Sequence, residues 1–159
     1  MNLPTLPDHM AERCEFQGRQ AVNPAGEFVL YWAHHALRTE QNPALQVAAR
    51  LALELNLPLL VYQGLGGRHR YNADRHHRFI LEAARDFSAS LAQHGQRLVM
   101  HLPTDPRKRG PIRDLMARSA LTVSELYPVL PFPAWIARHV KRNPDLPWLL
   151  VDASCILPM

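Results

Sequence analysis

Phe28-Val-Leu-Tyr-Trp-Ala-His34-His35-Ala-Leu-Arg38-Thr-Glu-Gln-Asn42-Pro43-Ala-Leu45 is the stretch that decides the fold. Its apolar beginning, residues 28–33, predicts a buried strand. Asn42 followed by Pro43 predicts a helix N-cap with proline at the first helical position. Polar side chains lie between these two elements, where an open α/β sheet presents its ligand crevice. The stretch therefore predicts a strand, a turn and a helix, with a candidate site in the turn.

The same alternation of strand and helix continues along the chain. Further strands are predicted at residues 58–63, 97–102, 121–125 and 147–152, and helices at 43–56, from about 72 or 74 to 95, at 111–118 and from 131 to about 140. Continuous apolar strands that alternate with helices indicate a mostly parallel sheet covered on both faces. The predicted fold is a Rossmann-like three-layer α/β/α sandwich with a five-stranded, mainly parallel sheet.

Three regions are predicted along the chain. Residues 1–26 contain three prolines and show no clear periodicity, so we expect an N-terminal extension that is only partly ordered. Residues 27–152 are predicted to form the α/β domain. Residues 153–159 are apolar and carry a proline, which we interpret as the start of an interdomain linker. A stop codon directly after Met159 would contradict that interpretation.

Composition favours an ordinary globular domain. The chain has 159 residues, of which 47% are hydrophobic and 20% are charged. It contains no apolar run near the ~20 residues that a bilayer span requires, and its N-terminus shows no signal pattern. We therefore expect a cytoplasmic protein with no membrane partner. The net charge of +4 permits contact with a polyanion, but the one dense basic run, Arg107–Arg109, is more typical of a solvated loop.

The common catalytic and metal-binding motifs are missing. The segment Gly64–His69 resembles the start of a dinucleotide-binding loop, but His69 replaces the third glycine and the segment follows the second strand. There is no P-loop, no nucleophile elbow and no metal-binding pattern among the nine histidines. The sequence predicts no catalytic residue and no metal ligand in this chain.

The ends of the predicted strands remain as the candidate ligand cleft. The candidate residues are His34, His35, Arg38, Gln63, Gly64, Tyr127 and Asp152. A planar, partly anionic ligand would stack on a histidine or tyrosine and pair with Arg38. In the alternative interpretation, Arg38 and Asn42 only tie down the turn and cap the helix.

A family resemblance rests on the same stretch. Trp32 matches a tryptophan that ends the first strand, Leu37-Arg38 matches the end of a turn, and Asn42-Pro43-Ala44-Leu45 matches the helix cap and start. On these residues the chain resembles the N-terminal region of the DNA photolyase and cryptochrome superfamily. The form Val-Leu-Tyr-Trp, residues 29–32, is closest to the class II deoxyribodipyrimidine photolyases.

Other segments extend the likeness in the same order along the chain. They are Asn23–Gly26, Leu57–Val61, Arg75–Glu82 and Leu150–Pro158. The chain departs from the family pattern in three places. His34-His35-Ala36 replaces the family's Arg-Asp, Gln41 replaces an aspartate, and Ser154-Cys155 replaces a His-Asn pair.

The resemblance implies a division of labour between two domains. The N-terminal α/β domain holds an antenna chromophore, a deazaflavin or a folate, in many members of the family. A C-terminal helical domain binds FAD, receives DNA and repairs pyrimidine dimers with light, as a carbon–carbon lyase. The implied partners are therefore that missing domain and, through the full-length protein, DNA. The 159 residues contain no counterpart of the flavin-binding motifs, so this span is expected not to be catalytic by itself.

Two other functions remain compatible with the sequence. A free-standing Rossmann-like nucleotide-binding module would have the same pattern of strands and helices, and so would an interaction module without catalysis. Cryptochrome-like signalling would also look the same at this level.

Overall fold

The predicted alternation is present in a computed structural model of the chain, which describes residues 4–65, 73–103, 105, 110–155 and 157. In chain order the elements are α1 (Asp8–Ala11), β1 (Cys14–Gly18), β2 (Phe28–Trp32), α2 (Pro43–Glu54), β3 (Leu59–Gly64), α3 (Asp74–Gln93), β4 (Leu98–His101), α4 (Ile112–Arg118), β5 (Ser119–Leu126), α5 (Phe132–Arg142) and β6 (Pro147–Asp152). All four longer helices and five of the six strands match predicted elements to within a few residues.

The strands form one sheet in the order β1-β6-β5-β2-β3-β4. Five strands are parallel, and β1 pairs antiparallel with β6 at one edge. The predicted α/β fold class is confirmed, but the predicted count of five strands is wrong. The extra strand lies within the stretch predicted as an extension. It is short, and none of its residues is fully buried, so it lacks the continuous apolar pattern that marks the central strands.

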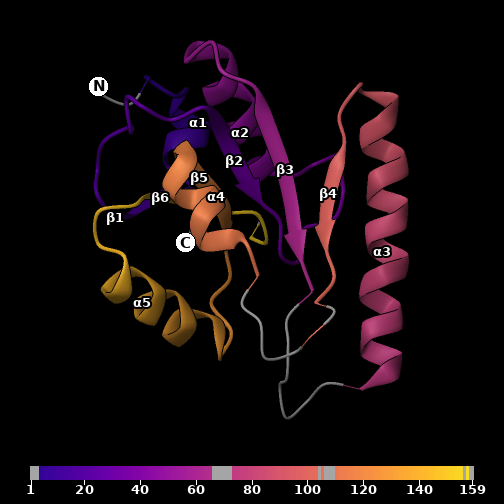
Figure 1. Cartoon of the computed structure of the whole chain (residues 1–159). Coiled ribbons are helices and arrows are strands. Elements are labelled where there is room, and N and C mark those ends of the chain that lie inside the picture. The colour runs from indigo at the N-terminus through magenta and orange to yellow at the C-terminus, as the bar shows by residue number, and fades with distance from the viewer. Residues whose placement is uncertain (1–3, 66–72, 104, 106–109, 156, 158–159) are drawn as a thin grey trace.

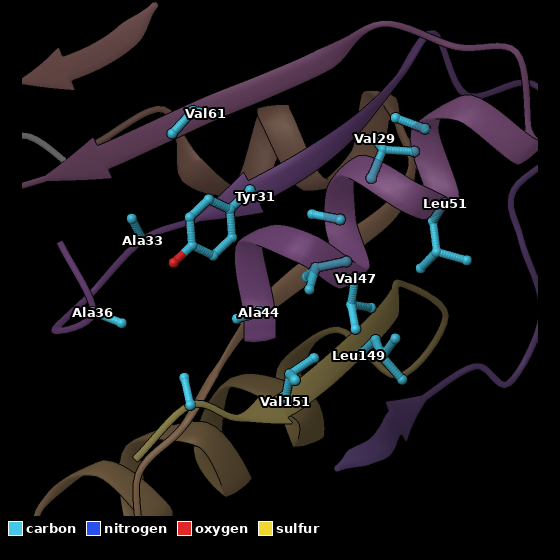
Figure 2. Packing of buried hydrophobic residues seen from close by; sticks show 14 of the residues in the cluster. Val29, Tyr31, Ala33, Ala36, Ala44, Val47, Leu51, Val61, Leu149 and Val151 are labelled. Atoms are coloured by element: carbon cyan, nitrogen blue, oxygen red, sulfur yellow. The ribbon is translucent and has the colours of Figure 1, made fainter. Parts of the chain in front are cut away.

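Helices cover both faces of the sheet. Alternate residues of β2 face opposite ways, so Val29 and Tyr31 pack on the side of α2 and α3 while Leu30 and Trp32 pack on the side of α4 and α5. Figure 1 shows α3 alongside the edge strand β4, and Figure 2 shows side chains from β2, β3 and β6 packed against α2. These two apolar layers hold the strand ends in place.

The join between β2 and α2 follows the predicted local chemistry. Asn42 is the N-cap of α2, its side-chain oxygen accepts a hydrogen bond from the backbone N of Leu45 at 3.1 Å, and Pro43 opens the helix. Gly95 ends α3 in the left-handed region at φ 71°, as its position predicts. Two predicted loop segments fall on residues outside the described part of the chain: residues 66–69 of the glycine-containing segment and the basic run Arg107–Arg109.

Candidate functional site

The carboxyl ends of the parallel strands gather at one edge of the sheet. From β2 the chain continues to β3 and β4 on one side of β2 in the sheet. It then crosses to β5 and β6 on the other side, so the strand order reverses between β2 and β5. Ligands of open α/β sheets bind in the crevice at such a point.

A pocket of about 580 Å³ lies at this edge, and we call it the aromatic pocket. Its described lining residues are Trp32, Ala33, His34, Tyr62, Gln63, Gly64, Leu65, Ile80, His101, Pro103, Gly110, Ile112, Pro131, Phe132, Ala134, Trp135 and Arg138. Three rings form one wall: the centroid of Trp32 lies 4.5 Å from that of His34 and 5.0 Å from that of Trp135. The lining is mostly apolar and aromatic, with few polar groups, as in sites for small planar molecules.

Two buried polar atoms border the aromatic pocket without a hydrogen-bond partner among the described residues. They are Gln63 Oε1 and His34 Nε2. The Gln63 side chain is almost fully buried, whereas His34 keeps part of its surface accessible. Burial, together with the nearby His35 and His139, lowers the pKa of His34 to about 3. The His34 ring is therefore neutral at physiological pH and contributes no positive charge to the pocket.

Four residues singled out in the sequence line the aromatic pocket: Trp32, His34, Gln63 and Gly64. Gly64 ends β3, where an added Cβ would lie 2.9 Å from the Tyr62 hydroxyl oxygen. Since that separation is shorter than ordinary contacts between such atoms, glycine keeps this end of the strand close to the Tyr62 ring.

The other four cleft candidates form a separate group beside the pocket, at the ends of β5 and β6. The His35 ring lies 4.4 Å from the Tyr127 ring, and its Nε2 lies 3.0 Å from Ser154 Oγ. Asp152 accepts hydrogen bonds from the backbone N of Ser154 and Cys155 at 2.9 and 3.0 Å. These contacts hold the turn that follows β6, and none of the four residues lines the aromatic pocket.

Arg38 and Asn42 organise the turn after β2. Arg38 donates to the backbone oxygens of Gln41 and Ala153 at 3.0 and 2.9 Å. Asn42 Nδ2 lies within hydrogen-bond distance of the backbone oxygens of Ala36 and Arg38 and of the Tyr31 hydroxyl. The geometry agrees with the interpretation in which these residues tie down the turn, and so hold His34 at the pocket wall.

Sequence reasoning missed Glu125, which is buried at the end of β5. Its carboxylate accepts hydrogen bonds from the Tyr31 hydroxyl at 2.6 Å and from the backbone N of His34 at 2.9 Å. Burial raises the pKa of Glu125 to about 7, although these hydrogen bonds oppose the rise. The signal was an acidic residue at the carboxyl end of an otherwise uncharged strand.

Helix α5 was not among the elements predicted to form the site. Phe132, Ala134, Trp135 and Arg138 come from its first two turns and line the pocket. Trp135 falls inside the helix predicted from residue 131 to about 140, but it was not among the predicted site residues. The adjacent Ile136 is buried in the core, and this leaves Trp135 at the boundary between the core and the pocket.

Within the described ranges no group of three histidine, cysteine, aspartate or glutamate side chains lies close enough to hold a metal ion. None of the described helices combines the length and the apolar composition needed to cross a bilayer.

Comparisons with known proteins identify relatives of this chain. The family model described as DNA photolyase matches residues 29–114, more than half of the chain. A deoxyribodipyrimidine photo-lyase from Methanothermobacter thermautotrophicus is 32% identical over 96 residues, which are 60% of this chain and 22% of that protein. The chain therefore spans about a fifth of that relative's length.

A solved structure is similar to the chain in fold. The universal stress protein from Archaeoglobus fulgidus aligns with a TM-score of 0.51 and 17% sequence identity, covering 79% of this chain and 98% of that protein. At this identity the likeness shows the Rossmann-like α/β fold alone.

Proposed function

This chain belongs to the DNA photolyase family, and on that premise we propose that its α/β domain holds a light-absorbing antenna chromophore in the aromatic pocket. The family assignment confirms the resemblance carried by residues 29–45. Membership of class II stays a prediction.

The observation that carries this proposal is the wall formed by Trp32, His34 and Trp135 at the switch point of the sheet. A volume of about 580 Å³ suits a ligand of two or three fused rings, because small-molecule sites commonly measure about 300–1,000 Å³. Aromatic walls stack on a planar ring and exclude water from it. The described residues therefore fit a deazaflavin or a folate.

An antenna absorbs light and passes the excitation energy to a second pigment. The residues of this chain would bind the ring, orient it and keep it rigid. Tyr31, Asn42 and Glu125 serve this purpose through the backbone of the turn that carries His34. A turn anchored at three points on the sheet and on α2 keeps the position of the pocket wall constant.

We propose that the chemistry itself belongs to a longer protein. The relative from Methanothermobacter thermautotrophicus is named as a deoxyribodipyrimidine photo-lyase. By analogy, FAD would bind outside these 159 residues, in a helical domain. The full-length protein would act on pyrimidine dimers in DNA as a light-driven lyase. Residues 153–159 would begin the linker to that domain, and none of the described residues is proposed to be catalytic.

Titration of the chain with a deazaflavin and with a reduced folate tests the antenna role. Near-UV and visible absorption reports binding of each compound, and tryptophan fluorescence reports its approach to Trp32 and Trp135. Retention of either chromophore with quenched tryptophan fluorescence would support the proposal. If no compound is retained, the antenna role is removed.

A matched pair of variants on α5 locates the binding. Ala134 and Ala137 are both exposed, but only Ala134 lines the aromatic pocket. Ala134→Phe should weaken chromophore binding about tenfold or more by filling the pocket, whereas Ala137→Phe should bind like the parent chain. Equal binding by the two variants would place the chromophore elsewhere.

A further inference from the structure

Gln63 is a buried polar side chain in the lining of the aromatic pocket. It follows four buried or half-buried residues of β3 and retains only 2% of its accessible surface. Its Oε1 has no hydrogen-bond partner within the described part of the chain. A buried carbonyl without a partner destabilises the empty protein, so a ligand that donates to it recovers free energy on binding.

A carboxamide recognises a particular kind of ligand edge. Rotation about the last side-chain bond of glutamine is broad, so either end of the amide can turn toward the pocket. The amide then offers a carbonyl acceptor and an N–H donor side by side. Its complement is an edge that carries an N–H next to a carbonyl, as in a lactam or an imide, because the two hydrogen bonds then form in one plane.

The charges around the pocket favour an uncharged ring. No acidic side chain occurs among the described residues of the lining, so a cationic ring would have no counter-ion there. The neighbouring His34 is neutral, because burial lowers its pKa to about 3. Arg138, near the middle of α5, is exposed and lines the pocket, where it suits an acidic tail on the ligand and not the ring itself.

We propose that Gln63 is the specificity-determining residue of the aromatic pocket and selects uncharged planar rings with adjacent N–H and C=O groups at one edge. The proposal rests on the proposed function, since it assumes that the pocket binds a planar ring. Flavin-like tricyclic rings and pterin-like bicyclic rings both carry this edge, and ring size distinguishes these two sources.

The test compares ligands that differ only at that edge. Lumiflavin and 3-methyllumiflavin form the tricyclic pair, and pterin and its N3-methyl derivative form the bicyclic pair. Each is titrated against the 159-residue chain and followed by tryptophan quenching and calorimetry. We expect at least one parent ring to bind about tenfold or more tightly than its methylated partner, because methylation removes a buried hydrogen bond. The ring size with the higher affinity identifies the source.

Two variants separate hydrogen bonding from steric effects. Gln63→Met keeps the length of the side chain but removes the amide, so the preference for the unmethylated ring should disappear while binding itself persists. Gln46→Met makes the same change at an exposed position of α2, outside the pocket lining, and should leave the preference intact.

The outcomes distinguish this inference from the proposed function. Equal binding of parent and methylated rings by the wild-type chain overturns the role of Gln63 and leaves the pocket as a binding site. A preference that survives in Gln63→Met also overturns it, because another group would then recognise the edge. Failure of every planar ring to bind removes the proposed function, and this inference with it.

Discussion

Asn42 joins β2, the turn after it and α2, and replacing it with alanine measures how much this joint stabilises the fold. Its Oδ1 caps α2 through the backbone N of Leu45 at 3.1 Å, an interaction that contributes about 0.5–2 kcal/mol. Its Nδ2 lies 2.9 Å from Ala36 O and 3.0 Å from both Arg38 O and the Tyr31 hydroxyl. Each buried hydrogen bond lost costs about 1 kcal/mol.

Because the Asn42 amide has only two N–H groups, the bonds to the turn and to Tyr31 contribute about 2 kcal/mol in all and the cap about 1 kcal/mol, so Asn42→Ala should lower the free energy of unfolding by about 3 kcal/mol. For a chain of this size the melting temperature should fall by about 6–12 °C. Urea denaturation followed by tryptophan fluorescence measures the change, provided that the m-value stays constant. Asn42→Ser keeps a capping oxygen but loses the amide donor, so it should be milder than alanine by about 1 kcal/mol.

An exposed residue on the same helix supplies the control. Gln46→Ala should change the free energy of unfolding by no more than about 0.5 kcal/mol. The reasoning is refuted if Asn42→Ala stays within about 1 kcal/mol of the wild type, or if serine is as damaging as alanine. The first result would mean that the bonds to the turn contribute nothing, and the second that the cap does not matter.

Two further predictions concern Glu125 and Gly26. Burial raises the pKa of Glu125 to about 7, so the folded chain keeps a proton that the unfolded chain has already released, and stability falls as pH rises from about 4.5 to 7. In urea titrations between pH 5 and pH 8, the free energy of unfolding of Glu125→Gln should therefore rise by about 2–3 kcal/mol relative to that of the wild type. The exposed Glu40→Gln should follow the pH dependence of the wild type. If Glu125→Gln also follows it, the pKa shift of Glu125 is contradicted. An added Cβ at Gly26 would lie 2.1 Å from the Ala120 backbone N, so Gly26→Ala should lower the free energy of unfolding by about 3 kcal/mol. Gly95 has φ 71° but open space around it, so Gly95→Ala should lower it by only about 1 kcal/mol. Equal losses of stability in thermal melts would disprove the clash at Gly26.

Most elements were predictable because their causes are local. A continuous apolar run such as residues 28–33 forms a strand that is buried on both faces, and Asn42-Pro43 marks a helix start by cap chemistry and backbone geometry. Strand β1 was missed because its residues are only partly buried. Its position depends on pairing with β6, more than a hundred residues further along the chain.

The residues of the candidate site were predictable only in part, for the same reason. The rule that ligands gather at strand ends selected His34 and Gln63, which line the aromatic pocket, but also His35 and Asp152, which hold the turn after β6. Sequence shows which residues follow a strand. It does not show to which side the next turn directs each side chain, because that depends on hydrogen bonds with distant elements.

By itself, the sequence determined the α/β class, the family and the order of the elements from β2 onward, because apolar periodicity, caps and short motifs depend on neighbouring residues. Only the tertiary structure brought Trp135 from α5 against Trp32 from β2, and Glu125 from β5 beneath the His34 backbone. These contacts join residues about a hundred positions apart. They arise from the packing of helices on a sheet whose strand order no local pattern encodes.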